Sequence, residues 1–169
     1  MGDTRLEPLT EAHLGDVVGL FDDEGVLRYT RVPDPVPPGW EHEWLAFYEE
    51  GRREGTREAF AIVDGGGVFL GLALAFGIER EGRQLELGYV ITPTARGRGV
   101  ATRALELLTE WAFDEVDALR IELWISTSNE PSKRVAERAG YSYEGTVRSF
   151  HFKEGIRDDF EIWARLGTD

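Results

Sequence analysis

Two alternating apolar stretches with a helical stretch between them limit the fold of this chain more than any other feature. In residues 84–91 and again in residues 119–125, apolar side chains fall at every second position, which is typical of strands with one buried face. From Ala101 to Ala112 they recur instead at helical spacing. A strand, a helix and a second strand in this order predict a crossover unit within an α/β fold.

The rest of the chain adds strands and helices on both sides of this unit. Further strands are expected over 4–8, 59–63, 68–76, 142–152 and 156–166, and further helices over 10–21, 40–53 and 131–139. Prolines exclude a helix from residues 31–39, which we expect to form a surface loop. This order predicts one domain over residues 1–169, with a mixed sheet of about seven strands and about four flanking helices.

The charge and hydropathy of the chain indicate which kinds of partner it can bind. Asp and Glu number 32 against 19 Lys and Arg, a formal net charge of −13, which argues against binding to nucleic acid. No apolar run is long enough to span a bilayer and the first residues do not resemble a signal peptide, so we expect a cytoplasmic protein without membrane contact. Most of the cations are arginine, a composition that suits a protein adapted to high salt or simply an acidic one.

Cysteine is absent, which excludes disulfides, thiolate nucleophiles and Cys-ligated metals. The histidines His13, His42 and His151 share no metal-binding spacing, so we expect no metal and place all three on the surface. Trp111, Trp124 and Trp163 suit core or sheet positions. Trp40 and Trp44 follow the proline-rich loop and suit either structural packing or the lining of an acceptor groove.

Residues 92–102 (Thr-Pro-Thr-Ala-Arg-Gly-Arg-Gly-Val-Ala-Thr) join the first of the two strands to the helix. Gly97 and Gly99 lack a Cβ, so several backbone N–H groups can converge on an anion, and the helix that follows adds its positive end. Arg96 and Arg98 supply mobile charge. An ordinary glycine-containing turn explains two glycines as well, whereas Thr102 and the absence of a Gly-Lys pair exclude a dinucleotide fingerprint and a P-loop.

Two sequence blocks favour the anion site. Arg96-x-x-Gly99-x-Ala101, placed after residues 86–91, resembles the pyrophosphate-binding signature of the GNAT N-acetyltransferase superfamily. Residues 128–141, followed by residues 144–148, resemble the branch that contains ribosomal-protein N-terminal (alanine or serine) acetyltransferases. The resemblance runs from about residue 4 to residue 166. It implies a mostly antiparallel central sheet in which two strands splay apart at the cofactor cleft.

The resemblance also implies a set of site residues around acetyl-CoA as the donor. The pyrophosphate would bind the turn made by Arg96, Gly97, Arg98, Gly99, Val100, Ala101 and Thr102, with the main-chain amides of residues 98–102 in contact with it. Val90 and Ile91 would pair with the pantetheine like an added strand. The resemblance implies that Asn129 hydrogen-bonds the pantetheine. Capping does not explain this residue, since Pro131 at the first helical position makes Glu130 the expected cap. Ser132 would lie near the thioester sulfur.

The chemistry assigns two catalytic candidates. Glu86 lies on the strand face opposite Leu85, Leu87 and Tyr89 and can relay a proton from the amine through water. The alternative interpretation is a solvated strand residue or the partner of a nearby arginine. Ser132 can protonate the departing thiolate only weakly, and a first-turn helix residue explains it as well. A main-chain N–H near Val90 or Ile91 can steady the oxyanion.

These features predict an acetyl-CoA-dependent N-acetyltransferase that acts by direct attack in a ternary complex, since no Ser–His pair or cysteine offers an acetyl-enzyme. The expected acceptor is a protein N-terminal α-amine. The alternatives are a small amine (polyamine, amino acid or aminoglycoside) and a non-catalytic acyl-CoA-binding module. The expected partners are acetyl-CoA and an amine acceptor, and the chain is expected to be a monomer or a homodimer.

Overall fold

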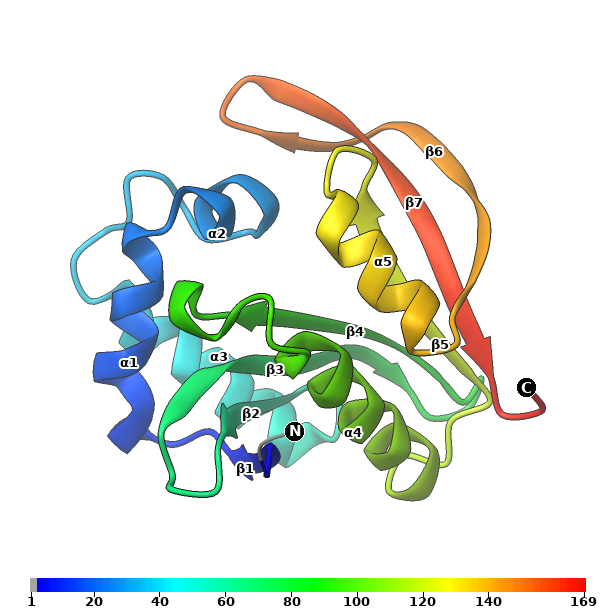
Figure 1. Ribbon diagram of the computed structural model, residues 1–169, viewed down its shortest axis with the longest axis horizontal. Helices are drawn as coiled ribbons and strands as arrows, with labels where there is room; N and C mark the ends of the chain where they lie inside the picture. The colour runs from blue at the N-terminus through cyan, green and yellow to red at the C-terminus, as the bar shows by residue number, and fades with distance from the viewer. Residues whose placement is uncertain (1–2) are drawn as a thin grey trace.

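The structure of the chain is a computed structural model that describes residues 3–169. Its centre is a seven-stranded sheet in the order β1-β2-β3-β4-β5-β7-β6 (Figure 1). The strands are β1 (Arg5–Pro8), β2 (Glu58–Val63), β3 (Phe69–Glu79), β4 (Gln84–Ile91), β5 (Arg120–Ser126), β6 (Ser142–Lys153) and β7 (Ile156–Leu166). The helices are α1 (Leu14–Gly19), α2 (Glu24–Tyr29), α3 (Trp40–Glu54), α4 (Val100–Asp114) and α5 (Glu130–Arg138), with 3-10 turns η1 (Glu11–His13), η2 (Leu20–Asp22) and η3 (Pro93–Ala95). The predicted mixed α/β fold is confirmed, because β4 and β5 are parallel and every other pair of neighbouring strands is antiparallel.

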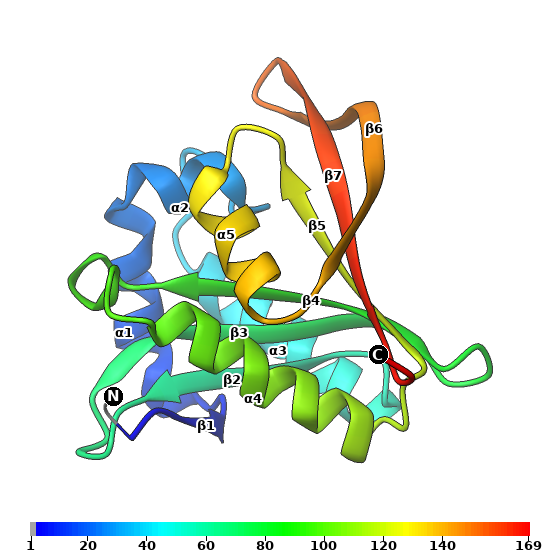
Figure 2. The ribbon, with the colours of Figure 1, turned by 45° about the vertical axis from the view of Figure 1, so that its right-hand side comes forward.

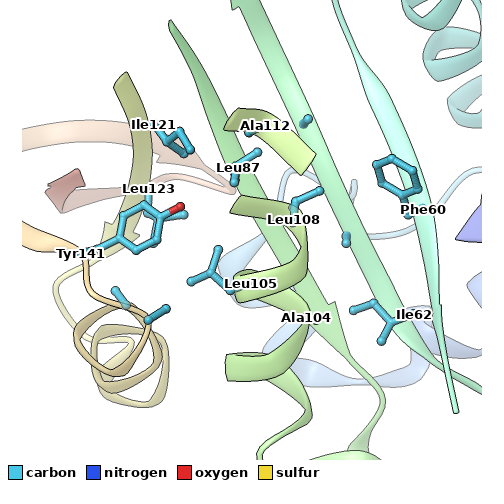
Figure 3. Close-up of a cluster of buried hydrophobic side chains, with 14 of the residues drawn as sticks. Phe60, Ile62, Leu87, Ala104, Leu105, Leu108, Ala112, Ile121, Leu123 and Tyr141 are labelled. Atoms are coloured by element: carbon cyan, nitrogen blue, oxygen red, sulfur yellow. The ribbon is translucent and has the colours of Figure 1, made fainter. Parts of the chain in front are cut away.

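Successive side chains of a strand point to opposite faces of the sheet, so a separate hydrophobic core forms on each face. In β2, Phe60 and Ile62 pack towards α4, whereas Ala59 and Ala61 pack towards α1 and α3. Figure 3 shows the first of these cores, in which α4 lays its apolar stripe on the sheet. Helix α4 is the crossover predicted between the two parallel strands, and its stripe comprises Ala104, Leu105, Leu108 and Ala112.

The segment between β1 and α3 differs most from the sequence-based expectation. Residues 10–21 form not one helix but η1, α1 and η2 in succession. The buried residues Leu14, Val17 and Leu20 are spaced three apart, which suits tight turns, and two glycines lower the helix propensity. Helix α2 was not predicted at all, because six residues are too few to show a period.

None of the helices among residues 3–169 is long and apolar enough to cross a membrane.

Candidate active site

The gap between β4 and β5 is the central feature of the site. The two strands pair only where residues 84–86 meet residues 120–122, although β4 continues to Ile91 and β5 to Ser126. Beyond the pairing, β4 stays hydrogen-bonded to β3 and β5 stays hydrogen-bonded to β7, so each strand follows its outer neighbour. Figure 2 shows the resulting V between the lower sheet and the β5–β7–β6 sheet edge. The expected splayed pair is therefore present.

The turn after β4 carries a run of backbone amides that have no acceptor within residues 3–169. Gly97 and Gly99 both adopt positive φ, +72° and +77°, and a Cβ built on either would meet no heavy atom within 4 Å. Within residues 3–169, no hydrogen bond engages the N–H groups of Gly97, Arg98 or Gly99. The first-turn amides of α4, from Val100 to Thr102, have no acceptor inside the helix. Several N–H groups and a helix N-terminus thus stand ready for an anion.

Arg96 does not supply the mobile charge that the sequence suggested. Its guanidinium donates to both carboxylate oxygens of Asp23, at 2.8 and 3.1 Å, and its Nε donates to the Ile91 carbonyl at 3.1 Å. The pair lowers the pKa of Asp23, chiefly through these hydrogen bonds. The side chain therefore clamps the turn to the start of α2, and Arg98, which is exposed, is the cation left to move.

The two strand-end residues Val90 and Ile91 present their main chains to opposite sides. Thr92 donates to the Leu70 carbonyl of β3 at 2.9 Å, so Val90, two residues earlier, faces the same edge. The Val90 carbonyl also lies against Gly71 of β3, where a Cβ would stand 2.0 Å from it. The N–H of Ile91 consequently faces the gap, where a ligand chain or an oxyanion would meet it.

Helix α5 forms the far wall of the gap, and one expectation about it was wrong. The helix begins at Glu130, so Asn129 is its N-cap and its Oδ1 accepts a long hydrogen bond, 3.4 Å, from the Ser132 N–H. Pro131 is tolerated at the second helical position, because its missing N–H would have no partner there. Capping thus accounts for the Asn129 oxygen, whereas no residue of the described chain engages its amide nitrogen. Ser132 Oγ lies 3.0 Å from the Tyr89 hydroxyl, on the gap side of α5.

Glu86 approaches the gap from the other face of the sheet, as the alternation predicted. It is half-buried beside its register partner Glu122, and no cation among residues 3–169 forms an ion pair with it. Burial raises the pKa of Glu86 to about 7; the charge of Arg31 lowers it and that of Glu122 raises it. A carboxyl group poised near neutrality suits a general base.

The face of β5 and β7 that continues from Glu86 carries aromatic side chains. Trp124 donates from Nε1 to Glu122 at 2.9 Å and stacks on Phe150 with ring centroids 4.4 Å apart; Phe160 lies 5.7 Å beyond. Trp124 is therefore a candidate for the site, not only a sheet residue. Phe150 was not predicted as a site residue, because the register shift between residues 147 and 151 interrupts the alternation of β6.

Trp40 and Trp44 pack against other aromatic side chains at the start of α3. Trp40 packs edge-on against Phe21 with ring centroids 5.5 Å apart, and Trp44 lies 5.0 Å from the Tyr48 ring. Both tryptophans belong to the packing of α3 against the η2 region and the loop before α3. The structural interpretation of these residues fits the structure.

Helix α2 bridges the two arms of the V. Asp23 at its start holds Arg96, and Arg28 at its end forms two hydrogen bonds with Asp158 of β7, at 2.5 and 3.1 Å. Lys153 donates to the carbonyl of Thr30 at 2.8 Å and also to that of Leu27. The helix therefore joins the amide turn to the β6–β7 hairpin on the Glu86 side of the sheet.

A cavity of about 350 Å³ lies between α2 and the hairpin. His151 lines it and is partly buried, and burial lowers its pKa. Both acidic and basic side chains line the cavity, together with two apolar ones: Glu24, Leu27, Arg28, Asp34, His151, Lys153, Glu154, Ile156 and Asp158. Residues 3–169 nowhere gather three His, Asp or Glu side chains that could hold a metal ion.

Comparison with known protein families identifies the class of protein to which the chain belongs. The family model described as an acetyltransferase (GNAT) domain matches residues 3–142 of the chain. The chain therefore belongs to the GNAT acetyltransferase family.

The relatives include proteins named for ribosomal proteins and proteins named for spermidine. The putative ribosomal N-acetyltransferase YdaF of Bacillus subtilis (strain 168) is 29% identical over 109 residues, 64% of this chain and 58% of that protein. The spermidine N(1)-acetyltransferase of Escherichia coli (strain K12) is 26% identical over 157 residues, 89% of this chain and 79% of that protein. The structure of RimL, a ribosomal L7/L12 alpha-N-protein acetyltransferase in complex with coenzyme A, superposes with a TM-score of 0.89 at 18% identity, covering 97% of this chain and 94% of that one. The match thus spans little more than half the length of YdaF, and the RimL likeness shows the fold.

Proposed function

We propose that the chain, residues 1–169, is one N-acetyltransferase domain that transfers acetyl from acetyl-CoA to a protein N-terminal α-amine by direct attack in a ternary complex. The observation that carries this proposal is the β4–β5 gap, which has unpaired amides at one end and Glu86 at its apex on the opposite face. Two substrates can then meet in the gap from opposite faces of the sheet.

On the donor side, the free N–H groups of residues 97–102 suit the pyrophosphate of acetyl-CoA. The Ile91 N–H lies beside the gap, where it suits a pantetheine amide or the oxyanion of the tetrahedral intermediate. The Asn129 amide nitrogen faces no protein acceptor within residues 3–169 and suits a pantetheine carbonyl. Ser132 suits a place near the thioester sulfur.

On the acceptor side, Glu86 takes the proton that the amine gives up, directly or through water. The amine nitrogen attacks the acetyl carbon, the new C–N bond forms and the C–S bond breaks. The amine loses one proton and the departing sulfur gains one, so the products are an amide and the free thiol of coenzyme A. Ser132 donates a hydrogen bond to the sulfur as its charge develops.

The pKa of Glu86 favours an α-amine as the acceptor. A base with a pKa of about 7 lies close to the usual range of an α-amine, roughly 7.7–8.0, and far from that of a lysine, roughly 10.4. The aromatic surface of Trp124, Phe150 and Phe160 adds apolar contact area for the first side chains of a peptide. The names of YdaF and RimL, which refer to ribosomal proteins, agree with this choice.

A small polyamine is the second candidate, and the cavity beside α2 favours it. Four carboxylates line that cavity, and the spermidine acetyltransferase of Escherichia coli is among the relatives. However, Arg28 already pairs with Asp158, and Lys153 also lines the cavity. These two cations lower the attraction of the cavity for a polyamine, so we place this acceptor second.

The test measures thiol released from acetyl-CoA over a panel of amines. One peptide beginning with serine and one beginning with alanine are each compared with the same peptide carrying a blocked N-terminus and an internal lysine. Spermidine, free amino acids and an aminoglycoside complete the panel. We expect release with the free N-terminus and little with the blocked control.

Other outcomes decide among the alternatives. Release with spermidine but not with either peptide would replace the acceptor and keep the chemistry. Binding of coenzyme A in calorimetry without release on any amine would instead favour a binding module. Absence of binding would overturn the proposal altogether.

A further inference from the structure

A hydrogen bond crosses the β4–β5 gap between Tyr89 and Ser132. Tyr89 lies on β4, three residues beyond the last position that pairs with β5. Its hydroxyl lies 3.0 Å from Ser132 Oγ and 3.4 Å from the Ser132 carbonyl, across 43 positions of sequence. The bond thus joins the strand on one side of the gap to the helix on the other.

The geometry leaves Ser132 with little freedom. Its N–H is held by the Asn129 cap, and its hydroxyl is held by Tyr89. Burial raises the pKa of Tyr89 to about 12, so the phenol keeps its proton at neutral pH and is able to donate it to Ser132 Oγ. Either hydroxyl of this pair can donate. When Tyr89 donates, Ser132 keeps its own proton for an acceptor in the gap.

We propose that Tyr89 is a positioning residue that aims the Ser132 hydroxyl at the thioester sulfur. The inference rests on the proposed function, because Ser132 meets a sulfur only if acetyl-CoA lies in the gap. As the C–S bond breaks, Ser132 stabilises the negative charge on sulfur by a hydrogen bond. Tyr89 itself loses no proton, and the proton that the free thiol finally carries is balanced by the one that the amine releases.

The plain alternative is a strut that holds α5 against β4 and has no part in the reaction. A strut and a positioning residue both change thermal stability when the hydroxyl is removed. Only a positioning residue lowers kcat at nearly constant KM, and only through Ser132. The two interpretations therefore separate in a double-mutant cycle.

The experiment compares Tyr89→Phe, Ser132→Ala and the double variant. We expect Tyr89→Phe to lower kcat about fivefold, the worth of one hydrogen bond, with KM for acetyl-CoA within about twofold of the wild type. We expect the double variant to be no slower than Ser132→Ala. Independent, multiplying losses would overturn the inference, as would a Tyr89→Phe variant that loses melting temperature but keeps its kcat.

Tyr141→Phe is the matched control. The Tyr141 hydroxyl is also buried and bonded, at 2.7 Å to Thr109 Oγ1, but it lies inside the α4 core (Figure 3). This variant should lose stability and keep its kcat. Calorimetry with coenzyme A separates the two possible failures: a wild-type protein that does not bind it sinks the proposed function, whereas normal binding with an unaltered Tyr89→Phe rate sinks only the role of Tyr89.

Discussion

Burial of the Glu86 carboxyl lowers the stability of the folded protein when the group is charged, and it also gives the group a pKa that suits a base. The group is half-buried without an ion pair in the described chain, and its pKa rises from 4.5 to about 7. The folded protein therefore binds more protons than the unfolded chain between these two values. Stability contributed by this group falls as the pH rises from about 4.5 to about 7, and the loss persists above that range.

Replacing Glu86 with glutamine should separate these two effects. In Glu86→Gln we expect the ratio of wild-type to variant kcat/KM to rise with pH, from near one at pH about 5.5 to at least about tenfold at pH about 8. The variant should also melt at a higher temperature than the wild type at pH about 8, since it removes a buried charge, and at a similar temperature at pH about 5.

The control for this prediction is Glu81→Gln, in the exposed turn between β3 and β4. It should change neither the pH profile nor the melting temperature. A Glu86→Gln loss of activity that is the same at every pH would assign Glu86 to packing and leave water as the base.

At the scale of elements, helices α3 and α4 form a natural pair for comparison. Each has 15 residues and each begins after a glycine of nearly the same conformation, Gly39 at φ +78° and Gly99 at φ +77°. A Cβ on either glycine would meet no heavy atom within 4 Å. The two positions therefore carry the same backbone strain when substituted, and differ in whether an anion is proposed to approach them.

Alanine substitutions at Gly39 and Gly99 should separate the effect of backbone strain from the effect on coenzyme A binding. We expect Gly99→Ala and Gly39→Ala to lose similar stability, about 1–2 kcal/mol for the left-handed conformation. Only Gly99→Ala should lose affinity for coenzyme A, by at least about tenfold, because its methyl group would stand where the pyrophosphate approaches. Calorimetry with coenzyme A on both variants measures the difference, and equal affinities would argue against the amide turn as the binding site.

At the scale of the whole molecule, the high net negative charge affects the stability of the fold. The formal net charge of −13 repels itself over distances that salt shortens, from a screening length of about 30 Å at 0.01 M to about 3 Å at 1 M. Self-repulsion of this kind favours the expanded, unfolded chain at low salt.

Salt should therefore raise the melting temperature. The dependence of the melting temperature on salt concentration should show whether the acidic composition is an adaptation to high salt. Simple screening predicts a rise that levels off by about 0.5 M NaCl. Adaptation to high salt predicts a further rise of stability and activity into the molar range of KCl. Thermal melts in a NaCl and a KCl series measure both, and a melting temperature that falls with salt from the start would contradict the role of self-repulsion.

Local patterns in the sequence determined the order of the strands and of the longer helices, the crossover between β4 and β5, and the glycine turn that follows residue 91. These follow from neighbours along the chain, since a period of two or 3.6 residues and a missing Cβ need no distant partner. Tertiary structure alone decided the bridging place of α2, the bond of Tyr89 to Ser132 and the ion pair of Arg96 with Asp23, whose members lie 73 positions apart. It also decided the raised pKa of Glu86, because burial and charge at a point in space depend on segments that the sequence places far from one another.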